Sequence, residues 1–202
     1  MKPSTSVHQT IVSSLQASVA LKQALLEDQK LIQTIAEVAE AMSRVLADGH
    51  KLFFFGNGGS AADAQHLAAE LVGRYQQERR ALPALALTAN TSTLTAIGND
   101  YSYERVFARQ LEALCSPGDV AVGISTSGKS PNVLSAMRAA KEIPVTTVGM
   151  TGMRGGELAA LSDYCICVPS EQTPRIQEAH ILIGHILCEV IEQKFVSEHD
   201  VS

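Results

Sequence analysis

Four side chains that could share a metal ion or pass a proton lie on two segments with helical spacing. His66 and Glu70 are four residues apart, so a helix places them on one face. Gln177 and His185 are eight apart, which brings them to nearly the same side of a later helix, whereas His180 fits that side poorly. Two imidazoles, a carboxylate and an amide oxygen form a set that could bind Zn²⁺ or a related divalent ion.

The histidine spacing is not diagnostic by itself, because either helix alone could simply carry a histidine satisfied within the core. The loop ahead of the first helix adds a second signal. Residues Lys51–Phe55 read as a buried strand, and Gly56–Ser60 follows as Gly-Asn-Gly-Gly-Ser directly before the helix of His66. Glycines let backbone N–H groups approach a ligand at a helix N-terminus. The sequence therefore predicts a ligand-binding turn beside His66.

A second polar loop, Ser125–Ser130, has four hydroxyls, one lysine and a glycine between the strand Asp119–Ile124 and a helix that begins at Pro131. Hydroxyls and free N–H groups at a helix N-terminus suit a phosphate. The plainer alternative is a helix cap with exposed serines. Ligands of open α/β sheets collect at the carboxyl ends of the strands, where both loops would lie, and this favours phosphate binding. Neither the P-loop spacing nor GxGxxG is present.

The elements that must hold these loops alternate between strands and helices. Each strand is a short and mostly unalternating apolar run, as in a parallel sheet that is buried on both faces. We predict an α/β fold with an open five-stranded parallel sheet flanked by helices, in one domain spanning 1–202. The expected strands are Lys51–Phe55, Ala84–Leu87, Asp119–Ile124, Val145–Val148 and Cys165–Val168. We expect five helices after the first strand: one that follows Ser60, one from near Thr93 that ends before Gly98–Asp100, one over Tyr103–Leu114, one that starts at Pro131 and one over Pro174–Lys194.

Two further helices precede the first strand, in an N-terminal part that we set at 1–48, ahead of the sheet core and last helix at 49–202. The first runs from about Thr5 to Glu27 and carries Val12, Leu15 and Val19 on one face; the second spans 29–47. A small sheet does not need both as cover. They either pack against another subunit or cover their own sheet, and the sequence leaves both open.

Composition narrows the class of protein and its location. The net charge of −5 and the pI near 5.7 leave no basic surface for nucleic acid. The four cysteines lie in apolar segments without CxxC spacing, which predicts buried free thiols in a reducing compartment. No apolar run reaches the ~20 residues of a membrane span, and the N-terminus has no hydrophobic signal core. We therefore expect a cytoplasmic protein that binds neither nucleic acid nor membrane.

The chain resembles the sedoheptulose-7-phosphate isomerase (phosphoheptose isomerase) family, within the sugar-isomerase (SIS) domain group. Four stretches carry the resemblance between about residues 30 and 195: FGNGGSAADAQHLAAELVGRY, AIGNDYSYERVF, GDVAVGISTSGKSPNVLSAM and RIQEAHILIGHILCEVIE. It implies a flavodoxin-like three-layer SIS domain and a homotetramer with active sites at subunit interfaces. It also implies a cytoplasmic enzyme that makes D-glycero-D-manno-heptose 7-phosphate from sedoheptulose 7-phosphate, the first step towards ADP- or GDP-heptose and lipopolysaccharide core.

The resemblance also assigns roles to individual residues. It implies one Zn²⁺ per subunit on His66, Glu70, Gln177 and His185, with Glu70 and His185 as the acid/base pair. An aldose–ketose isomerisation moves a proton between C1 and C2, so one base and one acid are needed. The implied substrate-binding positions are Asn57, Gly58, Gly59, Glu70, Asn99, Asp100, Ser125, Thr126, Ser127, Ser130 and Gln177.

Two departures from the family pattern and two alternative functions limit how far the properties of the family apply to this chain. Many relatives have an acidic residue where this chain has Asn90, and some have one at Pro174, so the substrate preference could differ. Other relatives are tetrameric adaptors that bind the bacterial replication initiator and lose catalytic residues. The presence of both Glu70 and His185 favours the enzyme. A phosphosugar-sensing regulatory domain is disfavoured because no DNA-binding segment is attached.

Overall fold

A five-stranded parallel sheet forms the centre of the computed structural model, which describes residues 6–196. The strand order β2-β1-β3-β4-β5 is that of a flavodoxin-like sheet and confirms the predicted fold class. Every neighbouring pair is parallel, as continuous apolar strands require. The strands are β1 (Leu52–Gly56), β2 (Ala84–Ala86), β3 (Val120–Ile124), β4 (Thr146–Gly152) and β5 (Tyr164–Val168).

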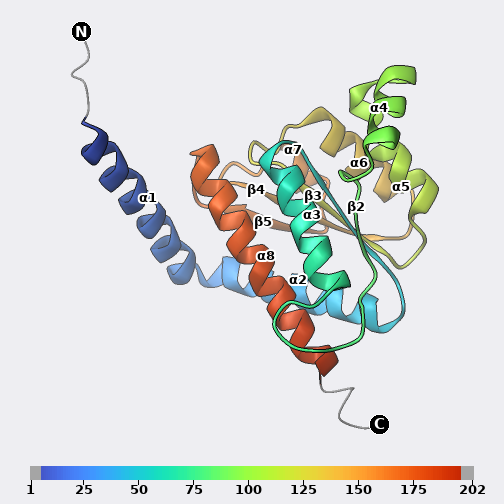
Figure 1. The fold of residues 1–202 in the computed structure, drawn as a ribbon, viewed down its shortest axis with the longest axis horizontal. Helices are drawn as coiled ribbons and strands as arrows, with labels where there is room; N and C mark the ends of the chain where they lie inside the picture. Colours follow the sequence, from blue (N-terminus) through green and yellow to red (C-terminus); the bar gives the residue numbers. More distant parts are fainter. Residues whose placement is uncertain (1–5, 197–202) are drawn as a thin grey trace.

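Helices cover both faces of the sheet and complete three layers (Figure 1). One apolar core lies between the sheet and α2, α3 and α8, and it includes Phe54, Val122 and Ile183. The other core lies under α4 to α7 and includes Phe53 and Phe55. The helices are α1 (Val7–Glu27), α2 (Gln29–Ala47), α3 (Gly59–Val72), α4 (Thr91–Asp100), the 3₁₀ turn η1 (Tyr103–Arg105), α5 (Ala108–Leu114), α6 (Pro131–Lys141), α7 (Gly156–Ala160) and α8 (Thr173–Val196).

The two N-terminal helices behave differently. Helix α2 buries Val38, Met42 and Leu46 and so covers its own sheet. Helix α1 extends away from the sheet beside α8 (Figure 1) and buries only Leu21 among its described residues. Leu15 and Val19 on the predicted apolar face of α1 are 63% and 66% exposed. Thr5, where we expected α1 to start, lies outside the described residues.

Three of the expected boundaries were wrong. Helix α4 continues through Gly98 to Asp100, because a glycine inside a helix costs only about 1 kcal/mol. The helix expected over Tyr103–Leu114 is broken, since Val106 and Phe107 turn inward and are 0% and 2% exposed. Strand β4 runs on to Gly152, past its expected end at Val148, and the short α7 was not predicted.

The cysteine prediction was half right. All four are free thiols, but only Cys188 is buried, and Cys115, Cys165 and Cys167 are half-buried. Cys165 and Cys167 lie on the same side of β5 with their Sγ atoms 3.6 Å apart. Within residues 6–196 no helix has both the length and the apolar character needed to cross a membrane.

Candidate active site

His66, Glu70 and His185 come together between α3 and α8. The Nε2 atoms of His66 and His185 are 2.9 Å apart, and His66 Nε2 lies 3.2 Å from Glu70 Oε1. One ligand atom from each residue lies within 4.8 Å of the others, so the group could hold a metal ion. Two imidazole nitrogens and a carboxylate oxygen are ligands that Zn²⁺ prefers. The structure thus brings Glu70 and His185 to one place within a single subunit, and their catalytic roles stay a prediction.

A glycine allows the two helices to approach this closely. Gly184 on α8 faces Leu67 on α3, and a Cβ atom at Gly184 would lie 2.6 Å from Leu67 Cδ2. Any larger residue would force the helices or the leucine to move. Gly184 directly precedes His185, and Leu67 directly follows His66. A close contact between the two helices therefore lies beside the paired imidazoles.

Gln177 lies at the other end of the same helix face, against the glycine loop. A Cβ atom at Gly59 would lie 1.5 Å from Gln177 Nε2, so only glycine leaves room for this amide. Gln177 thus borders the N-terminus of α3. The group of possible metal ligands comprises His66, Glu70 and His185, and the participation of Gln177 stays a prediction.

A pair of hydrogen-bonded side-chain amides holds the glycine loop in place. Asn57 and Asn132 exchange two side-chain hydrogen bonds of 2.8 Å, and Tyr103 Oη donates to Asn57 Oδ1 at 3.2 Å. Gly58 has a φ of 57°, a conformation that favours glycine, and forms the N-cap of α3. Asn132 belongs to the first turn of α6, so this amide pair ties the glycine loop to the end of the hydroxyl loop.

The hydroxyl loop is folded on itself around a buried serine. Ser125 Oγ lies 2.8 Å from Ser130 Oγ and 3.4 Å from Ser127 Oγ, and Ser125 is only 3% exposed. Ser130 is the N-cap of α6, and its side chain makes no capping hydrogen bond to any described residue. Pro131 has no N–H group and Val133 N donates to Asn132 Oδ1 at 3.0 Å, so within the described residues the Asn132 N–H is the group of this first turn that remains available to an anion.

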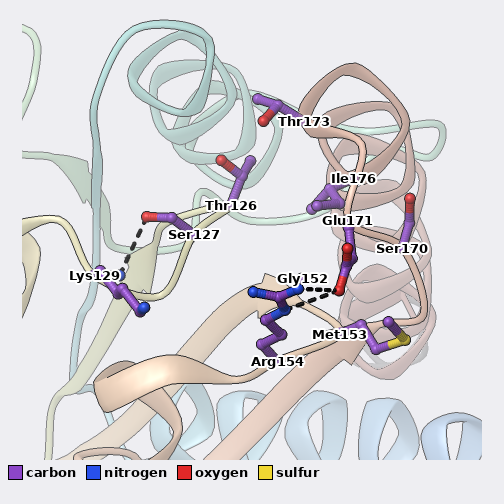
Figure 2. A pocket seen from close by; sticks show the side chains of 10 residues that line it. All are labelled: Thr126, Ser127, Lys129, Gly152, Met153, Arg154, Ser170, Glu171, Thr173 and Ile176. Atoms are coloured by element: carbon purple, nitrogen blue, oxygen red, sulfur yellow. Dashed lines mark hydrogen bonds and ion pairs between the residues drawn. The ribbon is translucent and has the colours of Figure 1, made fainter.

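Next to this loop lies a cavity of about 280 Å³. Figure 2 shows Ser127 and Lys129 on one side of the cavity and the ion pair of Arg154 and Glu171 opposite them. Gly128 has a φ of 64°, and a Cβ there would lie 2.2 Å from Gly155 O. The loop conformation is therefore restricted to glycine at this position. The lining residues are Thr126, Ser127, Lys129, Gly152, Met153, Arg154, Ser170, Glu171, Thr173 and Ile176.

Other predicted residues lie outside the cluster. Asn99 Nδ2 donates to Asp100 Oδ1 at the exposed end of α4, and Asp100 is not part of the His66 group. Asn90, one of the two departures noted above, caps α4 by accepting a hydrogen bond from Thr93 N. Pro174 stands in the first turn of α8. In this chain Asn90 therefore has a structural task.

A second carboxylate at the site was not predicted from the sequence. Asp63 lies one turn before His66 on α3, and its Oδ2 is buried without a hydrogen-bond partner among residues 6–196. Burial raises the pKa of the Asp63 carboxyl, although His66 and His185 oppose this. Its spacing of three from His66 was a usable signal. Tyr75 was missed too, and its ring packs on His185 with centroids 5.6 Å apart.

Comparison with known proteins gives consistent results. A family model described as SIS domain matches residues 15–152. A phosphoheptose isomerase of Aneurinibacillus thermoaerophilus is 52% identical over 192 residues, covering 93% of this chain and 97% of the relative. One from Aquifex aeolicus is 56% identical and covers 80% of this chain and 84% of the relative. The solved phosphoheptose isomerase of Neisseria gonorrhoeae superposes with a TM-score of 0.88 at 42% identity, over 93% of this chain and 100% of that one.

Proposed function

Because this chain belongs to the phosphoheptose isomerase family of SIS-domain proteins, we propose that it converts D-sedoheptulose 7-phosphate into D-glycero-D-manno-heptopyranose 7-phosphate. This isomerisation would be the first step towards ADP- or GDP-heptose and the lipopolysaccharide core. The observation that carries the proposal is the meeting of Glu70 with His66 and His185 on two facing helices. That arrangement brings a carboxylate and an imidazole to one reaction centre.

In the proposed mechanism, Glu70 and His185 transfer the proton between C1 and C2. Glu70 acts as the base that removes it, and His185 acts as the acid that supplies one to the enediolate. Both side chains contribute an atom to a group that spans no more than 4.8 Å, so the same pair of sugar carbons is within reach of each. This geometry supports the pairing that the resemblance implied.

The phosphate would anchor the far end of the sugar on the hydroxyl loop. Ser125, Thr126, Ser127 and Ser130 offer hydroxyls, and the first turn of α6 offers the N–H group of Asn132. Binding energy at this end positions C1 and C2 without acting on them directly. The remaining contacts to the sugar are assigned to Asn57, Gly58, Gly59, Asn99, Asp100 and Gln177.

The ligand set fits one Zn²⁺ per subunit. His66, Glu70 and His185 would hold it, with the amide oxygen of Gln177 as a fourth ligand. A bound Zn²⁺ would polarise the sugar carbonyl. Glu70 and His185 would then serve both as ligands and as proton carriers. Glu70 would need one carboxylate oxygen, and His185 one ring nitrogen, that does not bind the metal and can carry the proton.

We further propose a homotetramer with active sites at subunit interfaces, in the cytoplasm. The support is the apolar stripe of α1, whose Leu15, Val19 and Leu26 are 63% to 67% exposed. Such a stripe is typical of a helix that packs in a bundle. Neither nucleic acid nor membrane is expected as a partner.

Incubation of the purified protein with sedoheptulose 7-phosphate, followed by NMR detection of the aldose phosphate, tests the proposal. Turnover that depends on chelatable Zn²⁺ would support both the reaction and the metal. No turnover with or without Zn²⁺, together with tight binding to a replication initiator, would favour the adaptor alternative. The comparisons lend that alternative no support, since the relatives named above are isomerases.

A further inference from the structure

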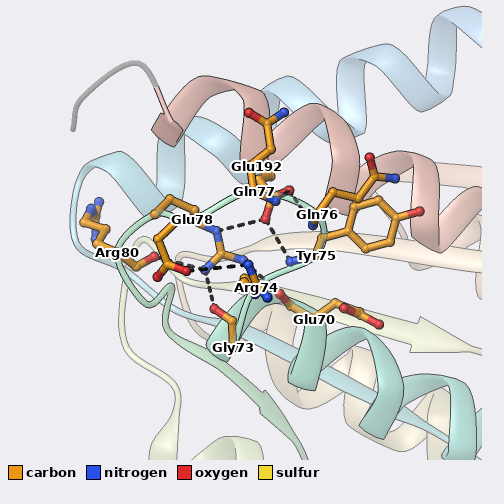
Figure 3. A network of polar contacts seen from close by, with 10 residues as sticks. Glu70, Gly73, Arg74, Tyr75, Gln76, Gln77, Glu78, Arg80 and Glu192 are labelled. Atoms are coloured by element: carbon orange, nitrogen blue, oxygen red, sulfur yellow. Dashed lines mark hydrogen bonds and ion pairs between the residues drawn. The ribbon is translucent and has the colours of Figure 1, made fainter. Parts of the chain in front are cut away.

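Glu192 is a buried carboxylate outside the set of residues that the proposed reaction uses. It lies on α8 and is 2% exposed. Its two oxygens accept hydrogen bonds from the backbone N–H groups of Tyr75, Gln76 and Gln77 at 2.8, 2.7 and 2.8 Å. Figure 3 shows this carboxylate directed at the loop that follows α3. Burial alone would raise the pKa of Glu192, but the three N–H donors and Arg79 bring it below its usual range.

Arg79 completes the network from the same loop. Its side chain is fully buried, and its Nε lies 3.6 Å from Glu192 Oε1. The two terminal nitrogens donate to the carbonyl oxygens of Glu70 at 2.8 Å and Gly73 at 2.9 Å. These carbonyls belong to the C-terminal end of α3, where helical carbonyls lack intrahelical partners and a cation is favoured. Arg79 therefore holds the last turn of α3, which includes Glu70.

The network also reaches His185. Glu192 follows His185 by seven residues, so both project from nearly the same side of α8. By fixing the backbone of Tyr75, Glu192 fixes the start of the side chain whose ring packs on the His185 imidazole at 5.6 Å and 33°. One buried carboxylate is thus connected to both members of the acid/base pair, through Arg79 to Glu70 and through Tyr75 to His185.

We propose that Glu192 and Arg79 are positioning residues of the isomerase, which set the geometry of Glu70 and His185 without touching the substrate. The inference rests on the proposed roles of Glu70 and His185. Loss of the network would leave α3 and α8 packed, because their contact through Leu67 and Gly184 is independent of it. The last turn of α3 and the ring of Tyr75 would no longer be fixed.

The test replaces Glu192 by glutamine, which keeps the shape of the side chain but removes its charge. The amide of Glu192→Gln turns an NH₂ group towards one of the three N–H donors, so at least one hydrogen bond is lost. We expect kcat per folded site to fall by about 10- to 100-fold, since small misplacements of catalytic groups cost this much. KM should stay within about threefold, because the hydroxyl loop is untouched. Arg79→Lys keeps the positive charge but cannot donate to both carbonyls as the two terminal nitrogens of Arg79 do. We expect the same result, a lower kcat with a nearly unchanged KM.

Asp119 provides a matched control. It is a buried carboxylate that accepts from the backbone N–H groups of Lys51 and Ser116, both at 2.8 Å, and pairs with the Lys51 ammonium at 3.1 Å. It precedes β3 at the amino edge of the sheet, at the end away from both ligand loops. Asp119→Asn should lower the thermal midpoint and leave kcat of the folded protein unchanged. All variants are assayed below the onset of their own unfolding transition.

Zn²⁺ affinity, measured by competition with a chelating dye, gives a readout besides turnover. Two of the ligands are held by the network, so Glu192→Gln should weaken Zn²⁺ binding by about tenfold and Asp119→Asn should not. Unchanged kcat and unchanged Zn²⁺ affinity in folded Glu192→Gln would overturn the inference and leave the proposed function intact. An inactive wild type that still binds Zn²⁺ would contradict the proposed function alone, and the affinities would then decide on the network. A wild type without turnover or Zn²⁺ binding would overturn both.

Discussion

The Nε2 atoms of His66 and His185 lie 2.9 Å apart, although 119 positions separate the two residues in the chain. At this distance one neutral imidazole can donate to the other, but two imidazolium rings would repel each other. Glu70 Oε1 lies 3.2 Å from the same nitrogen of His66. The short distance therefore fits either a hydrogen bond between the two rings or the candidate metal site, and both agree with the roles proposed above for this cluster.

Glu70→Gln should lower kcat by at least about a thousandfold, because the amide cannot accept the substrate proton. The assembly should stay intact, as measured by light scattering. Glu78→Gln is the control, since the Glu78 side chain lies on the nearby loop and is 85% exposed. Unchanged kinetics in Glu70→Gln would remove this residue from the mechanism.

Ser130→Ala should raise KM for the phosphosugar by roughly tenfold and change kcat little, because one hydroxyl donor to the phosphate is lost. Inorganic phosphate should inhibit the variant less strongly than the wild type. Ser162→Ala removes a hydroxyl that bonds Leu158 O and should leave KM unchanged. An unaltered KM in Ser130→Ala would argue that the phosphate binds elsewhere.

Gly59→Ala should displace the amide of Gln177, whose Nε2 would lie 1.5 Å from the new methyl group. We expect kcat/KM to fall by about tenfold, and Gln177→Ala to have a similar effect. In the double variant the two losses of kcat/KM should not add, because each substitution alone already removes the contact between Gln177 and the glycine loop. Fully additive losses would show that Gly59 and Gln177 act separately.

His180 should make the protein less stable in mild acid. Burial lowers its pKa to about 4, although a hydrogen bond to the Thr151 carbonyl opposes the shift. The unfolded chain, with a histidine pKa of about 6.5, therefore binds the extra proton first. Stability is fully present above pH ~6.5 and is lost as the pH falls towards ~4, by up to about 3 kcal/mol.

Urea unfolding between pH 7 and 5 measures this slope. His180→Gln should flatten it, whereas His8→Gln, on the exposed first turns of α1, should retain it. The lowered pKa of Glu192 acts in a more acidic range, below its ordinary value of 4.5. A wild-type stability that does not change over this interval would contradict the prediction.

Leu15→Glu should dissociate the proposed tetramer into smaller species, because it puts a charge on the exposed apolar stripe of α1. Ser13→Glu adds the same charge two residues away, on nearly the opposite side of the helix, and should leave the assembly intact. Multi-angle light scattering distinguishes the two results. An unchanged mass for Leu15→Glu would place the interface elsewhere.

The fold could be predicted because its signals are local. Strands such as Val120–Ile124 are continuous apolar runs, and the loops that follow them had to meet at one edge of a parallel sheet. The four-residue spacing of His66 and Glu70 likewise fixed their common face.

Other features depend on contacts between distant segments and left no pattern to read. The passage of α4 through Gly98 is one, because it depends on packing around buried Ile97. The pairing of Arg79 with Glu192 is another, since each residue alone looks like an ordinary surface charge. The inward turn of Val106 and Phe107 was hidden in a run that also suits a helix.

Gly184 acts as a spacer between the two helices that carry the proposed acid/base pair. Because the side chain of Gly184 is a single hydrogen atom, α8 packs closely on α3 beside His66 and His185. One methyl group at this position would therefore change the spacing of the candidate ligands on the two helices. A substitution at position 184 would therefore alter the selectivity among cations of different radius without replacing any of the candidate ligands.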